Sequence, residues 1–151
     1  MTLDPYIEGC ALRELVARGE VSPREVAEFF LARAERLNPT LGAYMTITAE
    51  RALDDAKRLE TSRRDAASLP LFGVAYSLKD LTPTLGIRTT LGSRNFEANL
   101  SPEQAIIATR LERAGGILIG KSTTPECGGR PTTEGGLCPT AHNPWNLDYN
   151  A

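Results

Sequence analysis

The chain has 151 residues, with 17 basic and 19 acidic side chains, and therefore a formal net charge of −2. Hydrophobic residues make up 41% and charged residues 24%, a balance typical of a soluble globular domain and not of a disordered chain. A pI near 5.5 without a basic cluster argues against nucleic acid as a partner, and no apolar run approaches the roughly 18–20 residues that cross a bilayer.

Residues 1–60 are predicted to be mainly helical. Asp4-Pro5 indicates the start of a helix that ends at Gly19, because proline is favoured at the first helical position and glycine just after the last. A second helix is predicted to begin at Ser22, where the pattern S-x-x-E forms a capping box, and to end at Asn38-Pro39.

The middle of the chain alternates between strands and helices. Short apolar runs predict strands at 43–48, 71–78 and 117–119, and helical spacing predicts helices at 49–59 and 102–114. Strands separated by helices indicate an α/β domain with a mostly parallel sheet.

The last 30 residues, from Ser122 onward, are rich in proline and glycine and are predicted to lack regular structure. Such a stretch counts against this assignment, marks a functional region, or is a segment whose packing partners are missing from this chain. Within it, Trp145 is expected to anchor the tail to the body. His142, with no acid at metal or triad spacing, is expected to be a hydrogen-bonded structural residue.

The N-terminus is acidic and has no apolar core like that of a secretory signal. The three cysteines, Cys10, Cys127 and Cys138, cannot all pair and form no C-x-x-C motif. We therefore expect reduced thiols and a cytoplasmic location.

Residues 115–122, GGILIGKS, match the P-loop pattern G-x-x-x-x-G-K-[ST]. A phosphate-binding loop needs a strand before its first glycine and a helix that starts at its lysine. Here a predicted helix precedes Gly115, and Pro125 follows Lys121 too closely for a new helix. We therefore predict a helix–Gly-Gly–strand unit and keep nucleotide binding as an alternative.

Lys79 stands where the predicted strand 71–78 ends. Alternation places it on the same face as the small residues Ala75 and Ser77, which leaves room around the ammonium group. A lysine partly buried at the carboxyl end of a strand can serve as a base or nucleophile. The alternative, which this segment alone favours, is a solvated lysine loosely paired with Asp80. Ser77 lies about 6.5–7 Å away along the strand, too far for a direct hydrogen bond.

Taken together, several segments resemble the amidase signature family. They occur in the order of that family: LFGVAYSLKD at 71–80, TTLGS at 89–93, AGGILIGK at 114–121, PE at 125–126, TE at 133–134 and NPW at 143–145. The resemblance implies α/β/α layers around a mixed, mostly parallel sheet. This chain would be the N-terminal part of that domain, with a helical segment at 1–60 and the start of the core at 71–151.

The resemblance also implies the chemistry. The family hydrolyses carboxylic amides through a Ser–cis-Ser–Lys triad, or serves as the glutaminase subunit of a tRNA-dependent amidotransferase. The lysine, acting through the cis-serine, takes the proton of the nucleophilic serine, which forms an acyl-enzyme that water releases. No metal or organic cofactor is required. Lys79 matches the family lysine, and the resemblance therefore favours a triad role over the solvated alternative.

The chain also departs from the family pattern. In the family, a Gly/Ser-rich segment supplies the cis-serine and the nucleophilic serine comes a little later. Both should follow Ala151, and Ser77, Ser93 and Ser122 do not stand in the matching context. Gly135 replaces an asparagine that often follows Thr-Glu.

A second departure concerns the loop after Pro-Glu. Cys127 replaces an aromatic residue that often follows Pro-Glu in the family, and its thiol is expected to be inert. With Gly128 and Gly129, it is expected to leave room for substrate.

Two classes of function follow. In the first, the chain is a fragment of a longer amidase and is inactive alone. Its partners would be a small amide, the remainder of the amidase and, as a further option, a second copy. In the second, it is a short non-catalytic binding or assembly module that has an amidase-like outline. Neither nucleic acid nor a membrane is an expected partner.

Overall fold

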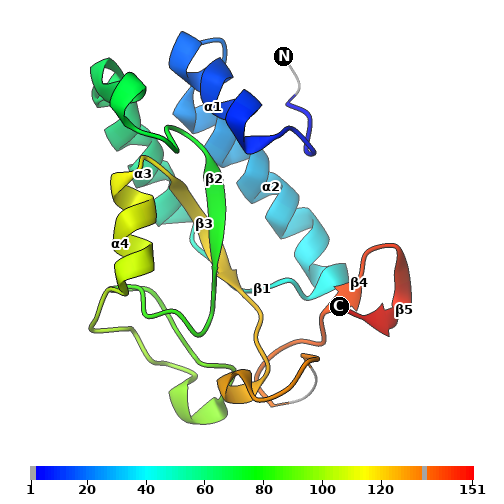
Figure 1. Ribbon diagram of the computed structural model, residues 1–151. Helices are drawn as coiled ribbons and strands as arrows, with labels where there is room; N and C mark the ends of the chain where they lie inside the picture. Colours follow the sequence, from blue (N-terminus) through cyan, green and yellow to red (C-terminus); the bar gives the residue numbers. More distant parts are fainter. Residues whose placement is uncertain (1–2, 134–135) are drawn as a thin grey trace.

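The computed structural model describes residues 3–133 and 136–151. Its main sheet has three strands in the order β1-β3-β2. β1 (Tyr44–Ile47) runs antiparallel to β3 (Ile117–Ser122), and β2 (Ala75–Lys79) runs parallel to it. A separate hairpin is formed by β4 (His142–Asn143) and β5 (Asn146–Asn150), and it projects from the body beside the end of α2 (Figure 1).

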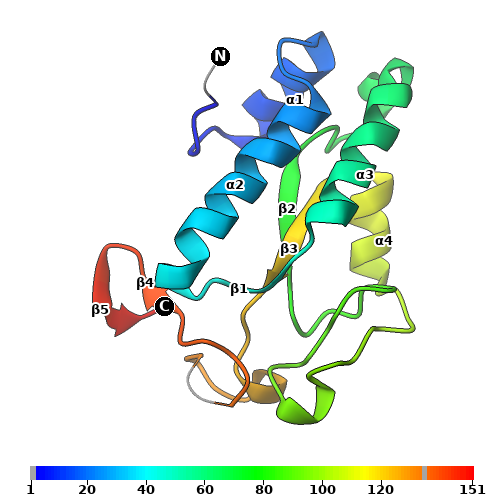
Figure 2. The same cartoon turned by 180° about the vertical axis from the view of Figure 1, so that it is seen from behind.

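Helices lie on both faces of the main sheet, as Figures 1 and 2 show from opposite sides. The α-helices are α1 (Gly9–Arg18), α2 (Pro23–Leu41), α3 (Ala49–Thr61) and α4 (Ile106–Arg113). Short 3-10 helices are η1 (Arg63–Ser68), η2 (Arg94–Phe96) and η3 (Glu126–Gly128). The three layers around a mixed sheet confirm the predicted fold class. None of the helices in the described part of the chain is long and apolar enough to cross a membrane.

Two hydrophobic clusters hold the layers together. The larger one joins α1, α2 and α3 to one face of the sheet, where Ile117 and Ile119 are buried, and Phe72 is its largest fully buried side chain. The smaller one packs Ala108 of α4 against Leu78 and Leu118 on the other face. Because burial of apolar area is the main stabilising term, β3 between the two clusters is the centre of the fold.

The predicted start of α2 is confirmed, but its predicted end is wrong. The Ser22 hydroxyl accepts a hydrogen bond from the N–H of Glu25, whose carboxylate accepts one from the N–H of Ser22. Pro39 does not end the helix, which continues to Leu41 and stops at Gly42 with φ 59°. A proline near the last turn removes only one donor, and the exposed site lets water bind the carbonyl left without a partner.

Three other predicted starts are wrong, because in each case a hydrogen bond that does not fit the predicted helix or strand forms where the element was expected to begin. Asp4 accepts a hydrogen bond from the N–H of Tyr6 in a turn, and α1 begins only at Gly9. Leu71 accepts one from the N–H of Val74, so residues before Ala75 turn and do not extend. The chain before α4 is likewise held away from helical geometry, because the N–H of Ala105 donates to the carbonyl of Pro83 at 2.9 Å.

The tail contains more structure than predicted, because the β4–β5 hairpin forms within it. Trp145 is 88% exposed, so the expectation that it anchors the tail is wrong. The anchors are smaller residues: the buried Cys138 thiol contacts the carbonyl of Thr124 at 2.6 Å, and Thr140 lies against Gly42 at the end of α2. The Nδ1 atom of His142 lies 2.8 Å from the carbonyl of Leu147, which confirms its hydrogen bond.

Candidate active site

Lys79 is the last residue of β2, at the carboxyl end of the two parallel strands. Its side chain is exposed, whereas Leu78 is buried against α4 on the opposite face, as the alternation predicted. The carbonyl of Lys79 accepts a hydrogen bond from the N–H of Thr82 at 2.9 Å, which turns the chain away from the strand. The ammonium group therefore stands at the end of the sheet where ligands collect in open α/β folds.

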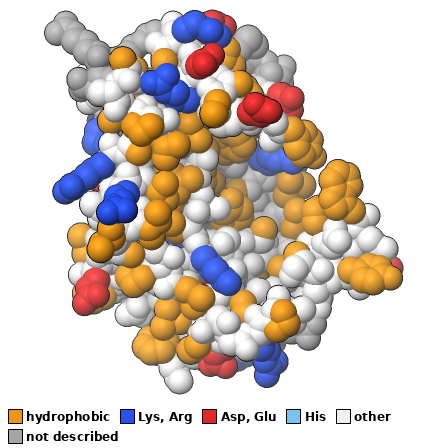
Figure 3. Space-filling model, in the orientation of Figure 1, with side chains coloured by type: hydrophobic (Ala, Val, Ile, Leu, Met, Phe, Trp, Pro, Cys, Tyr) orange, Lys and Arg blue, Asp and Glu red, His pale blue; other side chains and the backbone are white. Residues whose placement is uncertain are grey.

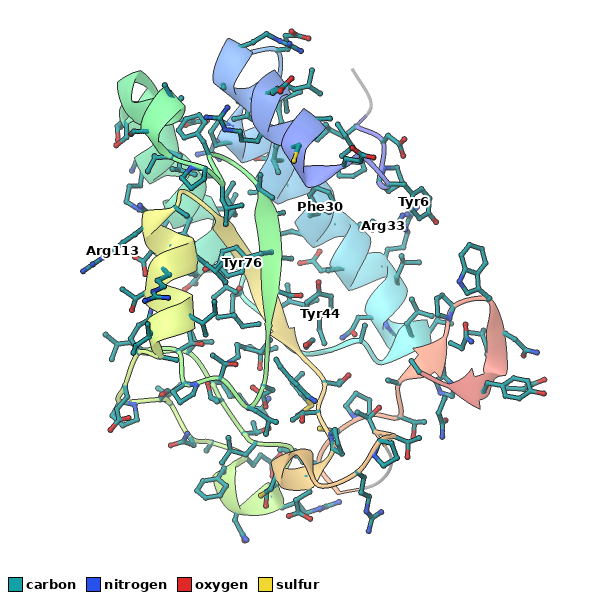
Figure 4. All side chains as sticks on the ribbon, in the orientation of Figure 1. Tyr6, Phe30, Arg33, Tyr44, Tyr76 and Arg113 are labelled. Carbon is teal, nitrogen blue, oxygen red and sulfur yellow. The ribbon has the colours of Figure 1, made fainter. Side chains whose placement is uncertain are left out.

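An open cavity of about 320 Å³ lies between α2 and the edge of the sheet formed by β2. Phe30 and Arg33 of α2 and Tyr44 of β1 line it, together with Ala75 and Ser77 of β2. Figure 4 shows Phe30, Arg33 and Tyr44 on one side of β2, whereas Tyr76 lies on the α4 side. Hydrophobic side chains surround the hollow on this face in Figure 3. The edge of β2 thus borders a largely apolar space, which would accept another polypeptide segment.

The loop that follows β2 and the loop that follows β3 are bonded to each other. The N–H of Cys127 donates to the carbonyl of Leu91 at 2.7 Å, and the Ser93 hydroxyl donates to the Glu126 carboxylate at 2.6 Å. Leu91 and Cys127 have φ values of 54° and 50°, in the left-handed region that non-glycine residues rarely adopt. Such conformations persist only where the surrounding contacts determine them.

The three predicted substrate-binding residues lie on the second of these loops. Gly128 packs so closely on Leu81 that a Cβ atom at that position would be 2.7 Å from Leu81 Cδ1. Cys127 and Gly129 are exposed. Since Leu81 follows Lys79 by two positions, the structure brings the predicted lysine and the predicted substrate loop to the same end of the molecule. Glu134 and Gly135, which belong to the next motif, lie outside the described residues.

Sequence reasoning missed the role of Asp80, whose side chain is fully buried behind Lys79. Its Oδ2 atom accepts hydrogen bonds from the N–H and the hydroxyl of Thr90, at 2.9 and 2.5 Å. The backbone of Asp80 is bonded on both sides, to the carbonyl of Ser122 and the N–H of Leu91. The expectation of a loose pair between Asp80 and Lys79 is therefore wrong, because the carboxylate of Asp80 is buried and hydrogen-bonded to Thr90.

Lys121 is the second buried charged residue of this region. Its Nζ atom donates to the carbonyl of Thr82 and to the hydroxyls of Thr84 and Thr89, at 2.5, 3.1 and 2.9 Å. Burial lowers the pKa of this ammonium group to about 8, and the nearby charge of Asp80 opposes that decrease. The P-loop alternative is therefore excluded, because Lys121 lies within β3 with its three donors bound to protein oxygens.

A signal for this network exists in the sequence. Four threonines, at 82, 84, 89 and 90, follow the Lys-Asp pair at short spacing, and short hydroxyl side chains are suited to binding buried charges. Which charges they bind is decided by the pairing of β2 with β3, which no local pattern reveals.

Other candidate groups do not complete a catalytic centre. Ser93 is bonded to Glu126, and Ser77 is exposed on the same strand as Lys79. Within residues 3–133 and 136–151, no group of histidine, cysteine, aspartate and glutamate side chains is arranged to hold a metal ion.

Comparison with known proteins places this geometry in context. Residues 25–151 match the family model described as Amidase. The A subunit of the glutamyl-tRNA(Gln) amidotransferase of Synechococcus sp. (strain CC9902) is 39% identical over 140 residues, which are 92% of this chain and 28% of that protein. The acylamidase of Rhodococcus erythropolis is 36% identical over 147 residues, which are 97% of this chain and 31% of that protein.

The fold is also similar to that of solved hydrolase structures. A 6-aminohexanoate cyclic dimer hydrolase, solved in complex with its substrate, superposes with a TM-score of 0.85 and 32% identity. The superposition covers 96% of this chain and 29% of the hydrolase. The chain therefore spans about three tenths of the length of the proteins it matches.

Proposed function

Because the chain belongs to the amidase signature family, we propose that residues 1–151 form the N-terminal part of an amidase. The enzyme would hydrolyse the C–N bond of a carboxylic amide to an acid and ammonia or an amine. One observation carries the proposal: Lys79, in the segment that matches the family motif, stands exposed at the carboxyl end of β2, beside an open sheet edge.

In this proposal Lys79 is the base of a Ser–cis-Ser–Lys triad. Both serines would come from polypeptide that lies beyond the described residues and approaches the free edge of β2. Lys79 accepts a proton relayed through the cis-serine, and the second serine attacks the amide carbonyl. The amine leaves with a proton, and water then releases the acid from the acyl-enzyme. The apolar hollow between α2 and β2 supports this arrangement, since it offers a surface for the segment that would carry the serines.

The substrate would lie against the loop at 127–129. Cys127 and Gly129 are exposed, and Gly128 holds the loop against the segment that follows Lys79. Small side chains at these three positions leave space for the group attached to the amide. A cytoplasmic location and pairing of two copies stay predictions from the sequence.

A second candidate is the glutaminase subunit of a tRNA-dependent amidotransferase. The observation in its favour is the 39% identity to the A subunit of a glutamyl-tRNA(Gln) amidotransferase. In that case the amide would be the side chain of glutamine, and the ammonia released would pass to a partner protein. The third candidate is a non-catalytic module with the same fold.

The test uses the complete reading frame that contains this chain. Its product is assayed on a simple aliphatic amide, an aryl amide and glutamine, as the wild type, as Lys79→Ala and as the control Lys57→Ala, which removes an exposed lysine of α3. Loss of the base should lower kcat roughly 100- to 10,000-fold, and the control should not change it. Preference for glutamine would favour the amidotransferase candidate. A reading frame that ends at Ala151 with an inactive product, or full activity of Lys79→Ala, would refute the amidase proposal.

A further inference from the structure

The buried pair Asp80 and Lys121 lies directly behind Lys79. In the parallel ladder, Leu78 is level with Lys121 and Lys79 is level with Ser122. Side chains that are level in neighbouring parallel strands point to the same face, and successive side chains alternate. Asp80 and Lys121 therefore share the buried face, and the side chain of Lys79 projects from the exposed one.

Two consecutive threonines connect the two charges. Thr89 accepts a hydrogen bond from the Lys121 ammonium group, and Thr90 donates two to the Asp80 carboxylate. Lys121 also binds the carbonyl of Thr82, whose N–H donates to the carbonyl of Lys79. The loop that follows Lys79 is therefore held by Lys121 near its start, at Thr82, and by Asp80 where it comes back to the sheet, at Thr90.

This arrangement is costly for the fold itself. Asp80 and Lys121 are both fully excluded from solvent, and the Oδ1 atom of Asp80 has no hydrogen-bond partner among the described residues. Buried charges lose their hydration, and replacement of such pairs by uncharged side chains of similar size is often neutral or stabilising. Residues that cost stability in a well-packed region are characteristic of functional sites.

Resting on the proposed function, we propose that Asp80 and Lys121 are positioning residues of the amidase site. They hold the backbone on both sides of the turn after Lys79, so that its ammonium group stays directed toward the serines that complete the triad. Neither residue contacts the substrate. Their effect is on the rate of the chemical step, because a base displaced from its partner loses much of its effect on that step while substrate binding is retained.

The test compares the double variant Asp80→Asn/Lys121→Met with both single variants in the complete enzyme. Each single variant leaves one buried charge alone and should lower the unfolding midpoint. The double variant should keep the midpoint of the wild type and leave KM within about twofold, but lower kcat at least tenfold. The matched control is Asp54→Asn/Lys57→Met, which removes one acidic and one basic exposed side chain from α3.

A second measurement uses the 151-residue chain and needs no activity. Hydrogen exchange at the N–H groups of Thr82 and Leu91 should become at least tenfold faster in the double variant and stay unchanged in the control. Full kcat in the double variant, or a loss of kcat that only follows a lower midpoint, would overturn the inference. If the wild-type enzyme has no turnover, the proposed function fails, and hydrogen exchange alone decides: unchanged exchange at both amides overturns the positioning role.

Discussion

Lys121 makes the stability of the chain depend on pH in an unusual direction. Burial lowers the pKa of its ammonium group from 10.5 to about 8, and Asp80 only partly opposes this. In the unfolded chain the group keeps the higher value. At pH values between these two pKa values, the unfolded state therefore binds more protons than the folded state, so the free energy of unfolding rises with pH.

The size of the effect follows from the two pKa values. One pKa unit corresponds to about 1.36 kcal/mol, so the full rise is roughly 3 kcal/mol. About 2 kcal/mol of it should fall between about pH 7.5 and 9.5. Tyr76 and Cys138 act in the opposite sense at higher pH, because burial raises the pKa of the phenol to about 12 and also raises the pKa of the thiol. The difference between the wild type and Lys121→Met removes these contributions.

The measurement is urea unfolding at several pH values, followed by far-UV circular dichroism. Tryptophan fluorescence is a poor probe because the one tryptophan, Trp145, is 88% exposed. The wild type should gain about 2 kcal/mol relative to Lys121→Met from about pH 7.5 to 9.5. Equal pH dependence in both proteins would refute the reasoning. It would show that the three oxygens around Nζ hold the proton as tightly as water does.

Two further predictions concern packing. Phe72→Ala should lower the free energy of unfolding by about 3–5 kcal/mol because Phe72 is fully buried. Trp145→Ala should change it by less than about 0.5 kcal/mol because Trp145 is exposed. Equal effects of the two substitutions in urea unfolding would contradict the assigned core. Gly42→Ala should destabilise the chain and loosen its tail, because the added Cβ would lie 2.3 Å from the carbonyl of Thr140 at a φ of 59°. Limited proteolysis should then cut near Thr140 sooner than in wild type, and unchanged cleavage would show that α2 does not hold the tail.

Local sequence signals succeeded where one turn of chain contains the whole interaction. The capping box at Ser22 and the left-handed Gly19 needed only neighbouring residues, and both formed as predicted. Local signals failed where distant contacts decide. The segment 71–74 has the composition of a strand, yet it turns so that Phe72 enters the core and Gly73 packs against Val16. The strand begins only at Ala75, where β3 is available as a partner.

The same distinction between local and distant contacts applies to the candidate site. Alternation along one strand was enough to place Lys79 on the face opposite Leu78, because it depends on the backbone alone. The roles of Asp80 and Lys121 depend instead on how β2 and β3 are aligned, and on a loop that returns to both strands. The P-loop pattern predicts that Lys121 binds phosphate. In the structure Lys121 is buried, and its ammonium group is hydrogen-bonded to three threonines. The residues that hold a catalytic group in place are therefore harder to identify from sequence than the group itself, since their partners are determined by tertiary structure.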